Sequence, residues 1–476
     1  MCGIIFSYTR RKPTVEQIEL ANISIGRRGP DQVGVLQHNT YGGHWATMVH
    51  SLLDISGHAT KQPFSDAGVP DHYLIFNGEI YNHKDFSDHA SDTAAILPSY
   101  QIAGPQWFEK TRGEFAVLIY DKKQEKLDVF TDPFLTKPIF IGRSDIPSEL
   151  CIASYPSALQ ALGFHQIQMA EPNTHYSFEL SSDGFALKQR FPMVSFALLQ
   201  TQSSYKNYFE CLIESVRLRA THGAHLPALS LSSGYDSGAI CLAMNLLGLS
   251  YQTVSVNSGE NEEVMRQRLT INKGLNIPHH AIDPLGKAEI RRVKHDIRSG
   301  VEPFRYTHQD GGGINHDLSS DSGAIGAYVV AERLKNLGVC VNLSGSGADE
   351  IYSDYGHGGQ KIYPHSEFGG LFPDQLEGFF PWKKFYGNTQ RSYLFKEEII
   401  FGHFGIESRY PLLDRELVQE FLALSPELKN QEYKAPIAAF LREHNYPFEP
   451  NKKRGFSARD LPIGKKIRRK IKSLFS

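Results

Sequence analysis

The sequence contains few cysteines and no long hydrophobic segment. Of its 476 residues only five are cysteines, and no two of them form a C-x-x-C pair. This argues against a disulfide framework or a structural zinc site. No apolar run approaches the ~18 residues of a transmembrane helix, and the start, Met1-Cys2-Gly3-Ile4, lacks the basic and apolar regions of a signal peptide. The sequence therefore predicts a cytoplasmic protein that does not enter a membrane.

An excess of charge of one sign is also absent. Lys and Arg total 50, Asp and Glu total 52, and the net charge is −2. This balance argues against nucleic acid or an anionic membrane as the main partner. Because 41% of the residues are hydrophobic, the chain can form sizeable cores, which excludes general disorder.

The chain divides into two parts with different patterns. In residues 1–195, short β-rich runs such as 73–77 and 115–120 alternate with turn residues, which predicts antiparallel sheets. In residues 203–476, strand-like runs alternate with helical periodicity, which predicts parallel βαβ units in a doubly wound domain. We expect the boundary between residues 191 and 204, and an α/β protein of two domains.

Cys2 differs from the other cysteines because only an initiator methionine precedes it. Once that methionine is removed, Cys2 carries a thiol and a free α-amine whose ordinary pKa is ~7.7–8.0. The amine can accept the thiol proton, so Cys2 would supply both nucleophile and base for attack on an amide carbonyl. The remaining four are expected to be buried small hydrophobic residues: Cys151, Cys211, Cys241 and Cys340.

Further polar residues follow a predicted strand at Phe76-Asn77-Gly78-Glu79. The Asn77 amide and the Gly78 N–H could donate to a developing oxyanion, and the Asp92 carboxylate could hold an ammonium group. Together with Cys2, these segments resemble the glutaminase domain of class II glutamine amidotransferases, an αββα sandwich of the N-terminal-nucleophile type. The resemblance implies that Cys2 attacks the glutamine side-chain amide and releases ammonia. It also implies that Asn77 and Gly78 form the oxyanion hole, and that Glu79 and Asp92 hold the amine end of glutamine.

One position departs from that pattern. The family has an arginine for the glutamine α-carboxylate where this chain has Val49, and no arginine occurs between Arg28 and Arg112. A guanidinium is a strong bidentate ligand of carboxylates, so its loss weakens glutamine binding unless another cation replaces it. His50 is the candidate for that cation. The retained catalytic residues favour an active or adapted glutaminase over an inactive relic.

A phosphate-binding loop is predicted at Ser232-Ser233-Gly234-Tyr235-Asp236-Ser237, between a strand and a helix. Its small residues let backbone N–H groups approach an anion, and the helix N-terminus adds a favourable dipole. The loop is neither a Walker nor a Rossmann motif. It resembles the S-G-G-x-D-S pyrophosphate loop of N-type ATP pyrophosphatases. The resemblance assigns to ATP and pyrophosphate the residues Ser232, Ser233, Gly234, Asp236, Ser237, Val256, Gly345 and Ser346.

A second strand-to-turn segment, Ser344-Gly345-Ser346-Gly347-Ala348-Asp349, offers another carboxylate. Asp236 and Asp349 are expected to hold Mg²⁺ on the ATP phosphates. Near the end of the chain, Lys453 matches the late lysine motif of the same family. Its ammonium would stabilise the charge that develops while a carboxylate is adenylated.

In this order the motifs cover nearly the whole chain and resemble glutamine-hydrolysing asparagine synthetases, which use ATP and Mg²⁺. The acceptor side differs, because Ser346 stands where the family's S-G-E-G segment has glutamate and Ser322 stands where an arginine is usual. Glu407 and Arg409 are interpreted as a buried structural ion pair. Because of the differences at Ser346 and Ser322, we predict a carboxylate acceptor other than free aspartate.

The predicted function is a glutamine- and ATP-dependent carbon–nitrogen ligase acting on small molecules. In it Cys2 supplies ammonia, and the second domain adenylates a carboxylate and forms its amide. One alternative is an amide- or lactam-forming ligase of specialised metabolism or peptide cyclisation with a weak or inactive glutaminase. Another is a non-catalytic scaffold. The sequence leaves open whether the protein forms a homodimer.

Overall fold

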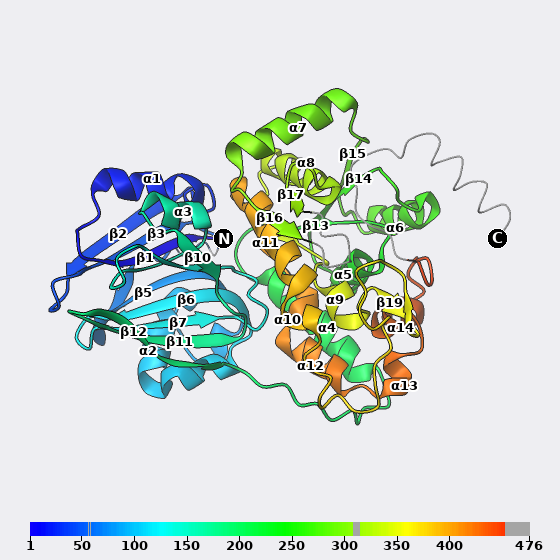
Figure 1. Cartoon of the computed structure of the whole chain (residues 1–476). Coiled ribbons are helices and arrows are strands. Elements are labelled where there is room, and N and C mark those ends of the chain that lie inside the picture. Colours follow the sequence, from blue (N-terminus) through cyan, green and yellow to red (C-terminus); the bar gives the residue numbers. More distant parts are fainter. Residues whose placement is uncertain (56, 58, 308–314, 453–476) are drawn as a thin grey trace.

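The computed structural model describes residues 1–55, 57, 59–307 and 315–452, and it forms two halves that lie side by side (Figure 1). The first 192 residues form the blue and cyan half. The residues from α4 (Lys206–Thr221) onward form the other half. The start of the chain lies between the two (Figure 1). No helix in the described ranges is long and apolar enough to cross a membrane.

The N-terminal half contains two antiparallel sheets with six strands each in the described part of the chain. The first has the order β10 (Gln166–Met169), β8 (Phe140–Arg143), β9 (Leu150–Ala153), β1 (Gly3–Thr9), β3 (Trp45–Leu52), β2 (Gln32–Asn39). The second has the order β12 (Gly184–Pro192), β11 (Thr174–Ser181), β7 (Lys126–Thr131), β6 (Gly113–Asp121), β5 (Val69–Ile80), β4 (Phe64–Asp66).

Alternating side chains explain how these sheets form layers. Ile4 and Phe6 of β1 pack between the two sheets, whereas Ile5 points to the opposite face and packs against helices. Helices α1 (Val15–Ile25) and α3 (Pro156–Ala161) cover the first sheet. Helix α2 (Asp92–Ala103) and the short helices η1 (His83–Asp85) and η2 (Gly104–Lys110) lie beside the second. The predicted αββα sandwich is confirmed.

The C-terminal half is built on a parallel sheet with helices on both faces. The strand order is β15 (His279–Ile282), β14 (Gln252–Val256), β13 (Ala228–Ser230), β18 (Val341–Leu343), β21 (Glu407–Arg409). On one face pack α4, α5 (Tyr235–Leu246), α9 (Ala348–Tyr352), α12 (Arg415–Ala423) and α14 (Ala435–Glu443). On the other pack α7 (Lys287–Gly300), α8 (Ser322–Asn336) and α11 (Asn388–His403). The predicted doubly wound domain is confirmed.

The remaining elements complete this half. They are α6 (Glu262–Gly274), α10 (Lys383–Tyr386), η3 (Pro411–Leu413), α13 (Pro426–Lys429), and the strand pairs β16 (Arg305–Thr307) with β17 (Asn315–Asp317) and β19 (Gly356–His357) with β20 (Gln360–Lys361). Residues 193–205 connect β12 to α4 without a helix or strand of their own apart from a single bridge at Gln202, and the domain boundary expected between residues 191 and 204 stays a prediction. One expectation is wrong in part, because Cys211 and Cys340 are only partly buried.

Buried charges join the two halves. The Lys137 ammonium, fully buried, lies 3.0 Å from Glu398 Oε1 and donates to the Ser408 carbonyl at 2.6 Å. The Arg28 guanidinium lies 3.0 Å from the other oxygen of Glu398. Glu398 belongs to α11, which runs along the border between the halves (orange in Figure 1). Because these charges are buried together, each carboxylate is stabilised by the cations beside it, and the loss of a cation would leave an uncompensated buried charge.

Replacing Lys137 with methionine therefore should destabilise the protein by about 3–5 kcal/mol, because a buried carboxylate loses a partner. Chemical denaturation followed by circular dichroism measures the effect. The matched control is Lys188→Met, because Lys188 pairs with Glu179 on the surface, where both side chains are more than half exposed. An exposed pair contributes only about 0–1 kcal/mol. Equal stabilities of the two variants would contradict the structural role of Lys137.

Candidate active sites

Cys2 is held at the start of β1 by contacts from both sides. Its backbone N–H donates to Asn77 Oδ1 at 2.8 Å, and its carbonyl accepts from Arg28 Nε at 2.9 Å. The first bond leaves the Asn77 amide nitrogen buried without a hydrogen-bond partner among the described residues. A buried donor without a partner beside a thiol is what an oxyanion site requires. The structure thus brings Cys2 and Asn77 together as the sequence predicts.

Gly78 has a backbone conformation that favours glycine. Its φ is +125°, and a Cβ there would lie 1.9 Å from the Glu114 carbonyl oxygen. A larger residue would push β5 away from β6, which carries Glu114. Gly78 is therefore required for the position of Asn77.

The Cys2 thiol needs a base. Burial raises its pKa to about 11, the ammonium at the start of the chain lowers it, and the carboxylates of Glu407 and Glu79 raise it. In the structure that ammonium belongs to Met1 and lies 2.8 Å from Glu407 Oε2. A thiol with such a pKa is protonated near neutral pH, so attack on an amide requires a nearby proton acceptor.

Glu79 and Asp92 lie together and share a third residue, His222. The His222 Nε2 lies 2.6 Å from Glu79 Oε2, and ligand atoms of all three side chains lie within 4.8 Å of one another. Asp92 begins α2, and its carboxylate accepts the backbone N–H groups of Ile80 and Thr93. Burial, followed by the charge of Glu79, raises the pKa of Asp92 to about 7. His222 directly follows α4 in the C-terminal half, and no local motif predicted it.

His50 is not the cation that replaces the missing arginine. Its Nε2 lies 3.1 Å from the Phe76 carbonyl oxygen, and burial lowers its pKa to about 3, so the ring is neutral. The prediction of a charged His50 is therefore wrong. The cationic groups beside Glu79 are His222 and Arg409, whose Nη2 lies 3.6 Å from Glu79 Oε1.

Arg409 links β21 to this cluster. Its Nε lies 2.7 Å from Glu407 Oε1, as expected for a buried ion pair. Its Nη1 also donates to the carbonyls of Arg219 and His222, both at 2.7 Å. The motif interpreted as structural thus positions His222 at the predicted glutamine site.

The second site is a cavity of about 530 Å³ at the carboxyl ends of β13 and β18. In the loop before α5, Ser237 Oγ accepts the Ser232 N–H at 3.0 Å, and Gly234 N–H donates to Ser232 Oγ at 3.1 Å. A Cβ at Gly345 would lie 2.7 Å from the Asp236 Cβ, so the two predicted loops touch. All five of these residues line the cavity.

Two predicted nucleotide ligands are placed differently. Ser233 does not line the cavity, because its N–H and hydroxyl both donate to the Glu260 carboxylate. Val256 is also absent from the lining and packs in the apolar core, whereas Val254 and Ser255 of the same strand face the cavity. The motif alone did not indicate that Val256 points into the core or that the Ser233 N–H is bonded to Glu260.

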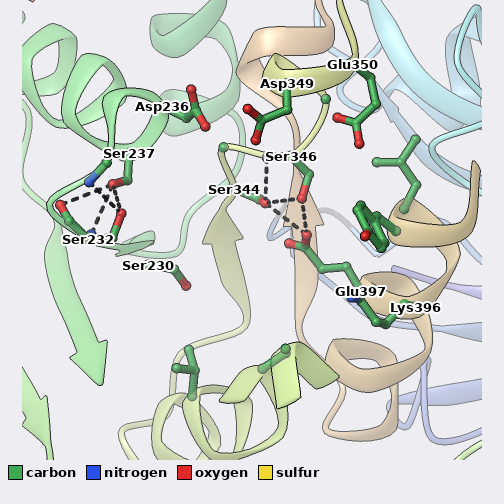
Figure 2. A pocket seen from close by; sticks show the side chains of 18 of the residues that line it. Ser230, Ser232, Asp236, Ser237, Ser344, Ser346, Asp349, Glu350, Lys396 and Glu397 are labelled. Atoms are coloured by element: carbon green, nitrogen blue, oxygen red, sulfur yellow. Dashed lines mark hydrogen bonds between the residues drawn. The ribbon is translucent and has the colours of Figure 1, made fainter. Parts of the chain in front are cut away.

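Asp236 and Asp349 converge on one cation. The Lys434 ammonium lies 2.7 Å and 2.8 Å from the two Asp236 oxygens and 2.8 Å from Asp349 Oδ1. The two aspartates lie on the same side of the cavity (Figure 2). Convergent carboxylate oxygens fit Mg²⁺, which prefers oxygen ligands. Lys434 was not predicted, since it precedes α14 outside any motif, and the predicted Lys453 lies outside the described residues.

Ser346 bonds to a carboxylate from α11. Glu397 Oε2 accepts from Ser346 Oγ at 2.6 Å and from Ser344 Oγ at 3.0 Å (Figure 2). Two long loops rich in Gly, His and Asp, a first loop of residues 306–322 and a second of residues 352–372, contribute to the lining of the same cavity. Its residues from those loops are His316, Asp321, Ser322, Tyr355, Tyr363 and His365. Residues 308–314 of the first loop lie outside the described ranges.

Comparisons with known proteins agree with this division. Residues 1–183 match the family model for the glutamine amidotransferase domain, and residues 208–393 match the model for asparagine synthase. A putative glutamine-hydrolysing asparagine synthetase of Methanocaldococcus jannaschii is 24% identical over 412 residues, covering 81% of this chain and 70% of the relative. A probable one from Acanthamoeba polyphaga mimivirus is 25% identical, covering 90% and 79%. Asparagine synthetase B of Escherichia coli is 23% identical, covering 90% and 76%.

Proposed function

Since the chain belongs to the family of glutamine-hydrolysing asparagine synthetases, as a divergent member, we propose that its two sites carry out successive steps of one ligation. The Cys2 thiol attacks the glutamine side-chain amide, ammonia leaves, and water hydrolyses the thioester to glutamate. In the second site a carboxylate oxygen attacks the α-phosphorus of ATP, and pyrophosphate leaves. Ammonia then attacks the acyl carbon and AMP leaves.

The observation that carries this proposal is the position of α11 between the sites. Glu398 binds Arg28, whose Nε holds the Cys2 carbonyl. Its neighbour Glu397 binds Ser346 in the cavity. Consecutive helical residues point about 100° apart, so one turn of α11 contacts both sites. Ammonia released beside Cys2 would therefore pass next to this helix on its way to the acyl adenylate.

In the second site, Asp236 and Asp349 would hold Mg²⁺, which neutralises phosphate charge when bound. The Lys434 ammonium would stabilise the negative charge that develops as pyrophosphate leaves, since it already lies between the two carboxylates. Ser232, Gly234 and Ser237 would face the phosphates from the start of α5.

The C-terminal half would complete the glutamine site. Glu79 and Asp92 would hold the glutamine ammonium, and Arg409, whose Nη2 lies 3.6 Å from Glu79 Oε1, would supply the positive charge for its carboxylate in place of the missing arginine. His222 lies within hydrogen-bond distance of Glu79 before glutamine binds, so the bound ligand has to share or displace that contact.

Glutamine should bind more tightly as pH rises towards 8. Protonation of Asp92, whose pKa is raised to about 7, removes a partner of the ammonium, and protonated His222 competes for Glu79. His83, whose ring lies 5.8 Å from that of His222, has its pKa lowered by burial. KM for glutamine should therefore rise by up to roughly tenfold per pH unit below that pKa. Steady-state glutamine hydrolysis from pH 6 to 8 measures it.

The control for this prediction is His222→Asn, which removes the competing imidazolium, so that the dependence of KM on pH that remains is that of Asp92. A KM that does not vary with pH in the unsubstituted protein would contradict the assignment of Asp92. Absence of glutamine hydrolysis at every pH would favour the alternative ligase with an inactive glutaminase.

The acceptor is proposed to be a carboxylate other than free aspartate. Among the described residues that line the cavity, carboxylates outnumber lysines six to one (Asp236, Glu260, Asp321, Asp349, Glu350 and Glu397). Its one lysine there, Lys396, lies 2.8 Å from Asp321. An acceptor with two carboxylates would meet more repulsion from this lining than a monocarboxylate would.

ATP–pyrophosphate exchange with a panel of carboxylic acids tests this proposal. We expect exchange with at least one monocarboxylic acid and little with aspartate. Exchange with aspartate alone would overturn the acceptor assignment, and no exchange with any acid would overturn the adenylation step.

A further inference from the structure

We propose that Glu397 is the proton acceptor for the nitrogen nucleophile, taking the place of the glutamate that related sequences carry at the position of Ser346. This inference rests on the ligase function proposed above. It concerns a residue of α11 that lies 51 positions further along the chain than Ser346.

The geometry places the Glu397 carboxylate where a glutamate at position 346 would end. Ser346 Oγ occupies the position of the second side-chain carbon of a glutamate. Glu397 Oε2 lies 2.6 Å beyond it, and Ser344 Oγ fixes the same oxygen at 3.0 Å. Figure 2 shows the three side chains joined in the cavity, with Asp349 drawn above them. A short residue at 346 thus leaves room for a carboxylate that a different helix supplies.

The reaction requires a proton acceptor at this point. When ammonia attacks the acyl adenylate, a C–N bond forms and the C–O bond to AMP breaks, with the electron pair leaving on AMP. The nitrogen then carries one proton too many, and the Glu397 carboxylate would accept it. General bases positioned in this way contribute about 10²–10⁴-fold to rate.

Three of the other five carboxylates in the described cavity lining are neutralised by lysines. Asp321 pairs with Lys396, and Asp236 and Asp349 pair with Lys434. Glu397 Oε2 accepts from the neutral hydroxyls of Ser344 and Ser346, which orient the carboxylate and leave its charge in place. Burial raises the pKa of Glu397, which strengthens it as a base. Its neighbour Glu398 faces the first site, so Glu397 lies on the side from which ammonia would arrive.

Glu397→Gln tests the proposal with ammonium chloride, ATP and the acid that gives the strongest pyrophosphate exchange. Amide formation should fall by about 10²-fold or more while exchange stays within about threefold, because adenylation precedes the proton transfer. The matched control is Glu210→Gln on the exposed face of α4, which should change neither rate.

The double variant Ser346→Glu/Glu397→Gln should recover at least tenfold of the lost amide formation, because it returns a carboxylate to the same place from position 346. A merely structural role would give no such recovery. Unchanged amide formation in Glu397→Gln, or an equal loss of exchange and amide formation without recovery in the double variant, would overturn the inference. If the unsubstituted protein forms no amide with any acid, the ligase function itself is wrong.

Discussion

Cys2→Ala should lose glutamine-dependent amide formation by about 10³-fold or more and keep the ammonium-dependent reaction within about twofold. Cys2, whose backbone N–H donates to Asn77, would supply the thiol that forms a bond to the glutamine carbonyl carbon, whereas the cavity proposed for adenylation lies in the other half of the chain. Amide formation is measured with glutamine and with ammonium chloride in parallel, using the acid that supports pyrophosphate exchange.

The control for Cys2→Ala is Cys211→Ala, which changes a partly buried cysteine of α4 and should leave both nitrogen sources effective. Persistence of the glutamine-dependent reaction in Cys2→Ala would contradict the nucleophile assignment. Mass spectrometry of the unsubstituted protein should show that Met1 is absent, because the α-amine of Cys2 is the expected base.

Asp236→Asn should reduce ATP–pyrophosphate exchange by about 10²–10³-fold and leave glutamine hydrolysis largely intact. The change removes one of the two carboxylates that would hold Mg²⁺ and leaves Lys434 with Asp349 alone. A titration with Mg²⁺ should show a weaker apparent affinity. Asp296→Asn is the control, since Asp296 pairs with Arg292 on the outer helix α7. Unchanged exchange in Asp236→Asn would remove this residue from the nucleotide site.

Groups that belong to recognisable motifs were predicted best. Asn77 lies in β5 and accepts the backbone N–H of Cys2, and the turns before α5 and α9 bring Asp236 and Asp349 together because β13 and β18 are neighbours. In each case a short motif contains both the functional residue and the backbone that positions it. A short motif therefore indicates both which residue is functional and how the backbone positions it.

Groups contributed from a distance were missed. His222 reaches Glu79 from the other half of the chain, Lys434 reaches two motifs from the start of α14, and Glu397 reaches Ser346 from α11. Each is an ordinary polar residue in its own segment, so no periodicity or spacing indicates its role. Burial is equally hidden in the sequence, which is why His50 was expected as a cation although it is neutral in the folded protein.

The chain departs from the family pattern at Val49 and at Ser346, and in each case a residue of another segment lies at the site with the missing charge. We propose that Arg409, beside Glu79, offsets the arginine missing at Val49 and that Glu397, bonded to Ser346, offsets the glutamate missing there. A site can thus keep its charge while the residue that supplies it moves to another element.

The transfer of ¹⁵N from [amide-¹⁵N]glutamine tests the coupling of the two sites most directly. The protein is incubated with labelled glutamine, ATP, Mg²⁺ and the acid that supports exchange, and the products are analysed by NMR and mass spectrometry. The account predicts one labelled amide for each AMP formed, with glutamate as the co-product. Label that appears only as free ammonium, or ATP that is converted to ADP instead of AMP, would contradict it.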